Sequence, residues 1–199
     1  MSPASRLQTS VAAGLASVVT TNVAILSAVV ASPSFSWSEN ALSNLGQPGT
    51  AVATPVTTAL FNGGLVLGGV LGVGFTVALW AVADNHVQRL AVPPFVGAMV
   101  AMAGVGVFPQ SQPLHAPAAI GLYLLSMVAM SFDGTGALIA GVVRRGAATL
   151  ALVVVHVGVW WWWSTGGPIL RAGLAVPEIA GALVITGWVV LVALSARGD

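Results

Sequence analysis

Residues 146–163, GAATLALVVVHVGVWWWW, decide how many times this chain crosses a membrane. The stretch carries no charged side chain and comes close to the ~20 residues that an α-helix needs to span a bilayer. Its four tryptophans suit the membrane interface, where indole rings lie at headgroup level and their N–H groups find partners. We therefore predict a full span that ends in an interfacial anchor, which gives the chain six spans rather than five.

The rest of the chain has the composition of a protein embedded in lipid. Hydrophobic residues make up 57% of its 199 residues and charged residues 6%, whereas a soluble domain has about 25% charged residues. The predicted fold is therefore all-α, a polytopic membrane helix bundle that forms a single integral membrane domain over residues 1–199. Its spans are expected at about 9–32, 56–83, 91–108, 117–143, 147–164 and 172–196.

The arginines predict how the bundle is oriented, because cytoplasmic loops carry an excess of Arg and Lys. With the N-terminus inside, five of the six arginines are cytoplasmic and only Arg171 lies outside. We expect a multi-pass protein of the plasma membrane with cytoplasmic N- and C-termini and with the loops 33–55, 109–116 and 165–171 outside. The first span is expected to be retained, since its apolar run exceeds the roughly 7–15 residues of a signal-peptide core.

Two missing residue types exclude several chemistries. The chain has no cysteine, which excludes disulfides and thiolate nucleophiles, and no lysine, which excludes a Schiff-base cofactor.

Its net charge of +1 gives no reason to expect nucleic-acid binding. The histidines lie at different predicted depths, which argues against a bis-His haem, and a zinc site would have to combine His115, His156 and Glu178 from separate elements. We expect no cofactor and no metal.

Three ionisable residues lie inside the predicted spans, where such groups are costly and mark either function or a specific polar pair. They are Asp133, His156 and Glu178. At about 1.5 Å per helical residue, His156 and Glu178 come to a similar depth and can pair, whereas Asp133 lies deeper. Arg171 can pair across an outer cavity or extend to the lipid headgroups. The roles of Asp133 and His156 stay open.

The first outer loop contains the main polar run of the chain, SWSENALSNLG at residues 36–46. Ser36 and Glu39 match the S-x-x-E capping box and Gly46 matches a C-terminal cap, so we predict a short amphipathic helix at 37–45. The side chains divide cleanly around a helical wheel, apart from Ser38. The apolar side comprises Trp37, Ala41, Leu42 and Leu45, and the polar side comprises Glu39, Asn40, Ser43 and Asn44.

If the polar side of this helix faces inward, it covers the outer end of the bundle. The candidate outer polar pocket then comprises Glu39, Asn40, Ser43, Asn44, Asn62, His115 and Glu178. A Ser-His-acid arrangement can be drawn from Ser43, His115 and either glutamate, but Ser43 lacks a nucleophile-elbow context, and Glu39 is explained by the capping box. We assign no catalytic residue, and the plain alternative is a capped surface connector with His115 in a loop.

Small residues predict where helices approach closely. Gly64, Gly68 and Gly72 recur at four-residue spacing in the second predicted span, the pattern that lets two backbones come together in a membrane. The third span continues the theme with Gly97 and Gly104. We expect the second and third spans to cross tightly, either within one bundle or between protomers.

Several short motifs resemble one family of prokaryotic multi-pass membrane proteins. They are NALSNLG (40–46), FNGGLVLGG (61–69), GVGVFPQSQPLHAPAA (104–119) and the glutamate at 178. Together they resemble the family catalogued as domain of unknown function 998, over about residues 8–196. The resemblance implies a six-helix membrane bundle found in archaea and bacteria, without an assigned activity. Its recurrent polar positions map to Asn40, Ser43, Leu45, Gly46, Asn62, Pro109, His115 and Glu178, whereas Asp133 and His156 have no place in it.

Three classes of function fit these observations. The first is a binding or accessory module whose partner is a membrane lipid, another membrane protein or a second copy of the chain. The second is a membrane-embedded hydrolase or transferase acting on a lipid or lipid-linked group, which needs His115 and a carboxylate at a lipid-accessible cavity. The third is a proton-coupled transporter using Asp133, His156 and Glu178, which needs polar residues in both halves of the bundle.

Overall fold

The computed structural model describes residues 2–166 and 173–196, so Arg171 and Arg197 lie outside the described residues. The described part is helical without strands, and six of its helices are long and apolar enough to span a membrane, as predicted. The spanning helices are α1 (Pro3–Val30), α2 (Pro55–Gly74) continued by α3 (Thr76–Ala81), α4 (His86–Arg89) continued by α5 (Val92–Val107), α6 (His115–Ile139), α7 (Val143–Ser164) and α8 (Ala175–Ser195).

Local sequence sets where these helices begin. The first helix begins at Pro3 rather than at residue 9, because Ser2 caps it by accepting a hydrogen bond from the Ser5 N–H, and proline suits the first helical position. The second begins after a capping box of Thr54 and Thr57. These caps satisfy backbone N–H groups that the helix itself leaves without a partner.

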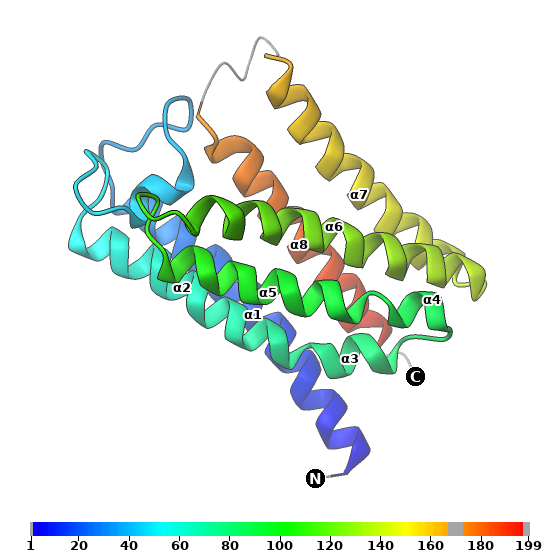
Figure 1. Cartoon of the computed structure of the whole chain (residues 1–199). Coiled ribbons are helices and arrows are strands. Elements are labelled where there is room, and N and C mark those ends of the chain that lie inside the picture. The colour runs from blue at the N-terminus through cyan, green and yellow to red at the C-terminus, as the bar shows by residue number, and fades with distance from the viewer. Residues whose placement is uncertain (1, 167–172, 197–199) are drawn as a thin grey trace.

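The spans form a closed ring in which each packs on the next, and α8 returns to α1 (Figure 1). The start of α1 and the end of α8 lie at the same end of the bundle as α3 and α4. We call this the α4 end. The opposite end carries the 31–54 loop with its short helix η1 (Leu42–Gly46), and we call it the η1 end.

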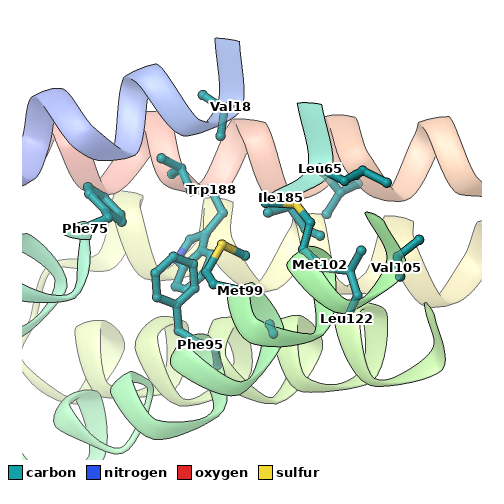
Figure 2. Close-up of a cluster of buried hydrophobic side chains, with 14 of the residues drawn as sticks. Val18, Leu65, Phe75, Phe95, Met99, Met102, Val105, Leu122, Ile185 and Trp188 are labelled. Atoms are coloured by element: carbon teal, nitrogen blue, oxygen red, sulfur yellow. The ribbon is translucent and has the colours of Figure 1, made fainter. Parts of the chain in front are cut away.

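Large apolar side chains fill the middle of the ring (Figure 2). Trp188 of α8 is fully buried, and Phe95 packs edge-to-face against it with ring centroids 5.5 Å apart. Phe75 continues the series, 6.0 Å from Phe95. Because lipid tails are as apolar as these side chains, their contribution here comes from close packing rather than from removal from water.

The glycine row of α2 has two neighbours. Gly64 lies against Ala24 of α1, and the Ser17 hydroxyl of α1 donates to the Gly68 carbonyl at 2.6 Å. The tight crossing expected between the second and third spans is also present, and it lies within one bundle. It involves Gly69 and Gly72, which lie against Met99 of α5, and Gly106 of α5, where an added Cβ would come within 2.5 Å of the Asn62 carbonyl oxygen of α2.

The helix predicted at 37–45 is wrong in extent and type. The structure has a 3-10 helix, η1, that begins at Leu42. Residues 36–40 form a turn instead, in which the Asn40 side chain, not Glu39, accepts the Ser36 N–H at 2.8 Å. Trp37 is exposed and packs edge-to-face on Phe35.

Tertiary contacts explain why no α-helix forms over 37–41. The Ser38 carbonyl accepts the N–H of Gly173 at 2.6 Å, and the Asn40 carbonyl accepts the N–H of Ala175 at 3.0 Å. An α-helix would use these carbonyls for its own hydrogen bonds. The segment instead pairs with the chain that leads into α8, and this pairing holds the 31–54 loop against the η1 end.

Asp133 anchors the α4 end. Its side chain is fully buried and forms an ion pair with Arg145 of α7. It also accepts hydrogen bonds from the Gln88 side chain at 3.1 Å and from the Trp188 indole N–H at 2.9 Å. Residues of α4, α6, α7 and α8 therefore meet on one carboxylate. Arg145, which the orientation argument counts as a surface charge, is buried.

Removing this carboxylate should destabilise the bundle strongly. In Asp133→Ala, Arg145 stays buried without its counter-ion, and breaking a buried pair from one side costs about 3–5 kcal/mol. We expect this loss in the free energy of unfolding of the purified protein in detergent. Arg144→Ala, which removes an exposed arginine next to Arg145, is the control and should change stability little. Equal stabilities of the two variants would refute the role given to Asp133.

Candidate functional site

Three polar residues from three elements meet at the η1 end. Ser43 lies on η1, His115 is the first residue of α6, and Glu178 lies in the first turn of α8. A carboxylate oxygen of Glu178 accepts the Leu42 N–H at 2.6 Å, which fastens η1 to α8. The Tyr123 hydroxyl donates to the Glu178 backbone carbonyl at 3.1 Å, so α6 is joined to the same turn.

The ring of His115 is held in one orientation. Its Nδ1 lies 2.7 Å from the Phe108 carbonyl oxygen. A carbonyl can only accept, so Nδ1 carries the proton and donates it, and in the neutral ring Nε2 is left with a lone pair. Prolines at 109 and 113 stiffen the connection between α5 and α6 that brings Phe108 to this position. His115 therefore presents a hydrogen-bond acceptor at the η1 end.

Two cavities meet at these residues. One is an internal chamber of about 70 Å³ between α1, α2, α5, α6 and α8. The other is a groove of about 500 Å³ between α6, α7 and the start of α8. The wall that both cavities share is made of Ser43, His115, Ala119, Tyr123 and Glu178.

The groove exists because α7 diverges from α6 towards the η1 end (Figure 1). At the α4 end the two backbones approach closely, and a Cβ added to Gly146 would come within 2.8 Å of the Gly134 carbonyl oxygen. Towards the η1 end, the bulky ring of Tyr123 lies between the helices, with ring centroids 5.6 Å from His156 and 5.3 Å from Trp160. Small residues at one end and large rings at the other spread the pair into a wedge.

Two polar atoms in this groove are buried without a hydrogen-bond partner among the described residues. They are Nε2 of His156 and Nε1 of Trp160. Both side chains line the groove, and His156 is only 2% exposed. The opposite wall is apolar and includes Ile120, Leu124 and Met127 of α6. The groove thus combines an apolar wall with polar atoms that lack partners.

The internal chamber has a polar side as well. The Thr21 hydroxyl and the Asn22 side-chain oxygen line it and have no partner in the described part of the chain, although Asn22 donates to Thr186 at 2.8 Å. A chamber of about 70 Å³ has room for water, since one water needs only about 10–15 Å³ of such volume. Water in the chamber could satisfy these atoms.

The structure separates the predicted pocket into two groups. Ser43, His115 and Glu178 line the same cavities, and His156, predicted at the depth of Glu178, lines the groove with them. The other members lie elsewhere: Glu39 is exposed, Asn40 closes the turn on Ser36, Asn44 bonds the Ala41 N–H and Gln110, and Asn62 donates to the Gly46 carbonyl. Those asparagines support the backbone of the loop and its contacts.

Sequence reasoning missed Tyr123 and Trp160. Both were accessible from helical spacing, because His115, Ala119 and Tyr123 follow one another at four-residue steps, as do His156 and Trp160. Tyr123 is also the only tyrosine of the chain. The WWWW run predicts an interfacial anchor, and Trp160 also shares a helix face with His156 four residues earlier.

The groove does not have the geometry of a metal site. His115, His156 and Glu178 all line it, but no three His, Asp or Glu side chains in residues 2–166 and 173–196 lie close enough together to hold a metal ion.

Comparison with known proteins gives a family and no activity. The family described as "Protein of unknown function (DUF998)" matches residues 11–195, nearly the whole chain, which confirms the resemblance found in the motifs. No curated protein and no solved structure matches the chain.

The bond from Glu178 to η1 can be tested by hydrogen exchange. In Glu178→Ala the Leu42 N–H loses its acceptor, which for a buried donor costs about 1–3 kcal/mol and corresponds to roughly 5- to 150-fold faster exchange. The expected increase would be measured by mass spectrometry on peptides covering residues 38–46. Glu178→Gln is the matched control, because its amide oxygen can still accept. Unchanged exchange in the alanine variant would contradict this role of the carboxylate.

Proposed function

The chain belongs to the DUF998 family of proteins of unknown function, and we propose that it binds a membrane lipid or lipid-linked molecule in the groove between α6, α7 and α8. The observation that carries this proposal is the pair of buried nitrogen atoms without partners, on His156 and Trp160. In the hydrocarbon region water is scarce, and each unsatisfied polar group costs several kcal/mol. A bound molecule with a polar head removes that cost.

The shape of the groove supports a lipid as the occupant. Its volume of about 500 Å³ is typical of pockets for small organic ligands, which range over about 300–1,000 Å³. Ile120 and Leu124, which line it, are also largely exposed on the surface of α6 that lipid would contact. An acyl or prenyl chain could therefore lie against α6 while its head reaches the polar wall of Ser43, His115 and Glu178. In this proposal the protein is a binding or accessory module.

Filling the groove should remove the bound lipid. In Leu124→Trp a larger ring occupies the apolar wall, and we expect the lipid that co-purifies with the protein to fall at least about tenfold, equivalent to ~1.4 kcal/mol of binding free energy. The measurement is mass spectrometry of lipids extracted from the purified protein in mild detergent.

The matched control is Leu183→Trp on α8. Leu183 is 56% exposed and Leu124 is 52% exposed, but only Leu124 lines the groove. The control should retain the lipid of the wild-type protein. If both variants keep it, or if the wild-type protein carries no lipid at all, the proposal is wrong.

We further propose that the η1 end faces the outside of the plasma membrane and that both termini are cytoplasmic. Arg6, Arg89 and Arg144 lie at the α4 end, which supports this orientation, although buried Arg145 no longer counts towards it. The absence of cysteine allows a direct test with single introduced cysteines. Glu39→Cys should react with an impermeant maleimide in intact cells, whereas Arg144→Cys should react only after lysis. The reverse pattern would invert the orientation.

A second candidate is a hydrolase or transferase acting on the bound lipid. It is favoured by the His115 ring, whose protonated Nδ1 is fixed and whose Nε2 is available as a base at a cavity that Ser43 and Glu178 also line. The lipid extraction described above distinguishes the two candidates. Lipid turned over by the wild-type protein but left intact by His115→Ala would establish an enzyme, and unchanged lipid in both supports binding alone.

Asp133 does not support a proton-coupled carrier. It lines neither of the two cavities described here, and its carboxylate is already bonded by Arg145, Gln88 and Trp188. A group that exchanges protons with a transport path needs access to that path. We therefore assign Asp133 a structural part in the bundle.

A further inference from the structure

The groove contains no cationic side chain among the described residues that line it. Its ionisable members are the carboxylate of Glu178, the two imidazoles of His115 and His156, and the phenol of Tyr123. Proteins hold phosphate groups with Arg, Lys or several convergent backbone N–H groups. A phosphate placed in this groove would meet a carboxylate instead, so the lining opposes an anionic headgroup.

The hydrogen-bonding groups of the groove are mixed. The indole N–H of Trp160 is a donor without a partner in residues 2–166 and 173–196. On the acceptor side, one oxygen of Glu178 is used by Leu42, which leaves the other oxygen, and Nε2 of His115 carries a lone pair. A hydroxyl group on the ligand donates one hydrogen bond and accepts up to two, so it can accept from the indole N–H and also pair with Nε2 of His156 in either tautomer.

Positively charged lipid heads leave more of the hydrogen-bonding groups in the groove without a partner. A trimethylammonium group would find the rings of Tyr123 and Trp160, but it makes no hydrogen bond and leaves the indole N–H without a partner. A primary ammonium could pair with Glu178, but the phosphate attached to it would have no cation among the lining residues. The chemistry of the lining therefore favours an uncharged head.

From this we infer that the groove selects an uncharged lipid with a hydroxyl-bearing head, of the diacylglycerol or long-chain alcohol type, in preference to phospholipids. The inference rests on the proposed function, because it names the class of lipid that the groove takes. The head lies at the shared wall, where it accepts from Trp160 and donates to Glu178 or His115. The chain lies along Ile120 and Leu124 of α6.

The experiment is competitive photocrosslinking to the full-length protein in nanodiscs. Four probes carry the same photoreactive acyl chain and differ in their heads: diacylglycerol, phosphatidylglycerol, phosphatidylethanolamine and phosphatidylcholine. Crosslinked peptides are located by mass spectrometry. We expect the diacylglycerol probe to label the peptides containing residues 116–127 and 156–160 at least about fivefold more than each phospholipid probe, the ratio expected from one additional hydrogen bond.

Two variants test the assigned contact. Trp160→Phe keeps an aromatic ring but removes the N–H, and it should reduce labelling by diacylglycerol about fivefold. Trp161→Phe is the matched control, because Trp161 is 70% exposed and does not line the groove. His115→Ala, which removes an acceptor at the shared wall, gives a second variant if Trp160→Phe elutes abnormally on size exclusion, and it should likewise weaken the diacylglycerol signal.

The outcomes separate this inference from the proposed function. Equal or stronger labelling of the groove by a phospholipid overturns the inference and leaves lipid binding in place. Loss of labelling in Arg171→Gln also overturns it, because a cation from outside the described residues would then hold the head. No groove labelling by any probe overturns both.

Discussion

A carboxylate in the hydrocarbon region needs a counter-ion and hydrogen-bond donors close to it, and the bundle has to supply these partners to Asp133. Three other helices provide the partners, which are Arg145, Gln88 and Trp188, so one group of polar contacts holds the α4 end together. Because Arg145 lies at the start of α7, that helix is held firmly at the α4 end. Further along, α7 diverges from α6 over the bulky rings of Tyr123 and Trp160, and the groove lies in the space between the two helices.

The spans can be predicted from the sequence because each spanning helix is a continuous stretch of apolar residues. Hydropathy over about 20 residues does not depend on what the helix touches, and all six predicted spans are present. The contacts between helices are harder to predict from the sequence than the spans are. The spacing of Gly64 and Gly68 reveals a face that admits a close neighbour, but nothing in the spacing identifies α1 as that neighbour. Arg145 shows the same limit, since its burial depends on Asp133 in another helix.

Site residues within the spans could be placed from their depth in the membrane, whereas those in the 31–54 loop could not, because their positions depend on the conformation of the loop. Counting residues along two spans put His156 and Glu178 at one level, and both line the groove. The helix expected at 37–45 failed because its capping signal is local, whereas Ser38 and Asn40 use their carbonyls to bind the chain before α8. Asn40 and Asn44, which the helical wheel puts on a polar face, therefore make contacts within the loop and with Gln110 instead.

The attachment of the 31–54 loop to α8 also has a consequence for biosynthesis. Leu42 and Glu178, which join η1 to α8, are separated by 136 positions in the chain. The ribosome makes the loop near the beginning and its partners Gly173, Ala175 and Glu178 near the end. All five earlier spans must therefore enter the bilayer before the ring can close. Until then the polar wall has only part of its residues, so the groove is complete only after α8 has joined the ring, and a chain truncated before α8 would lack Glu178 from that wall.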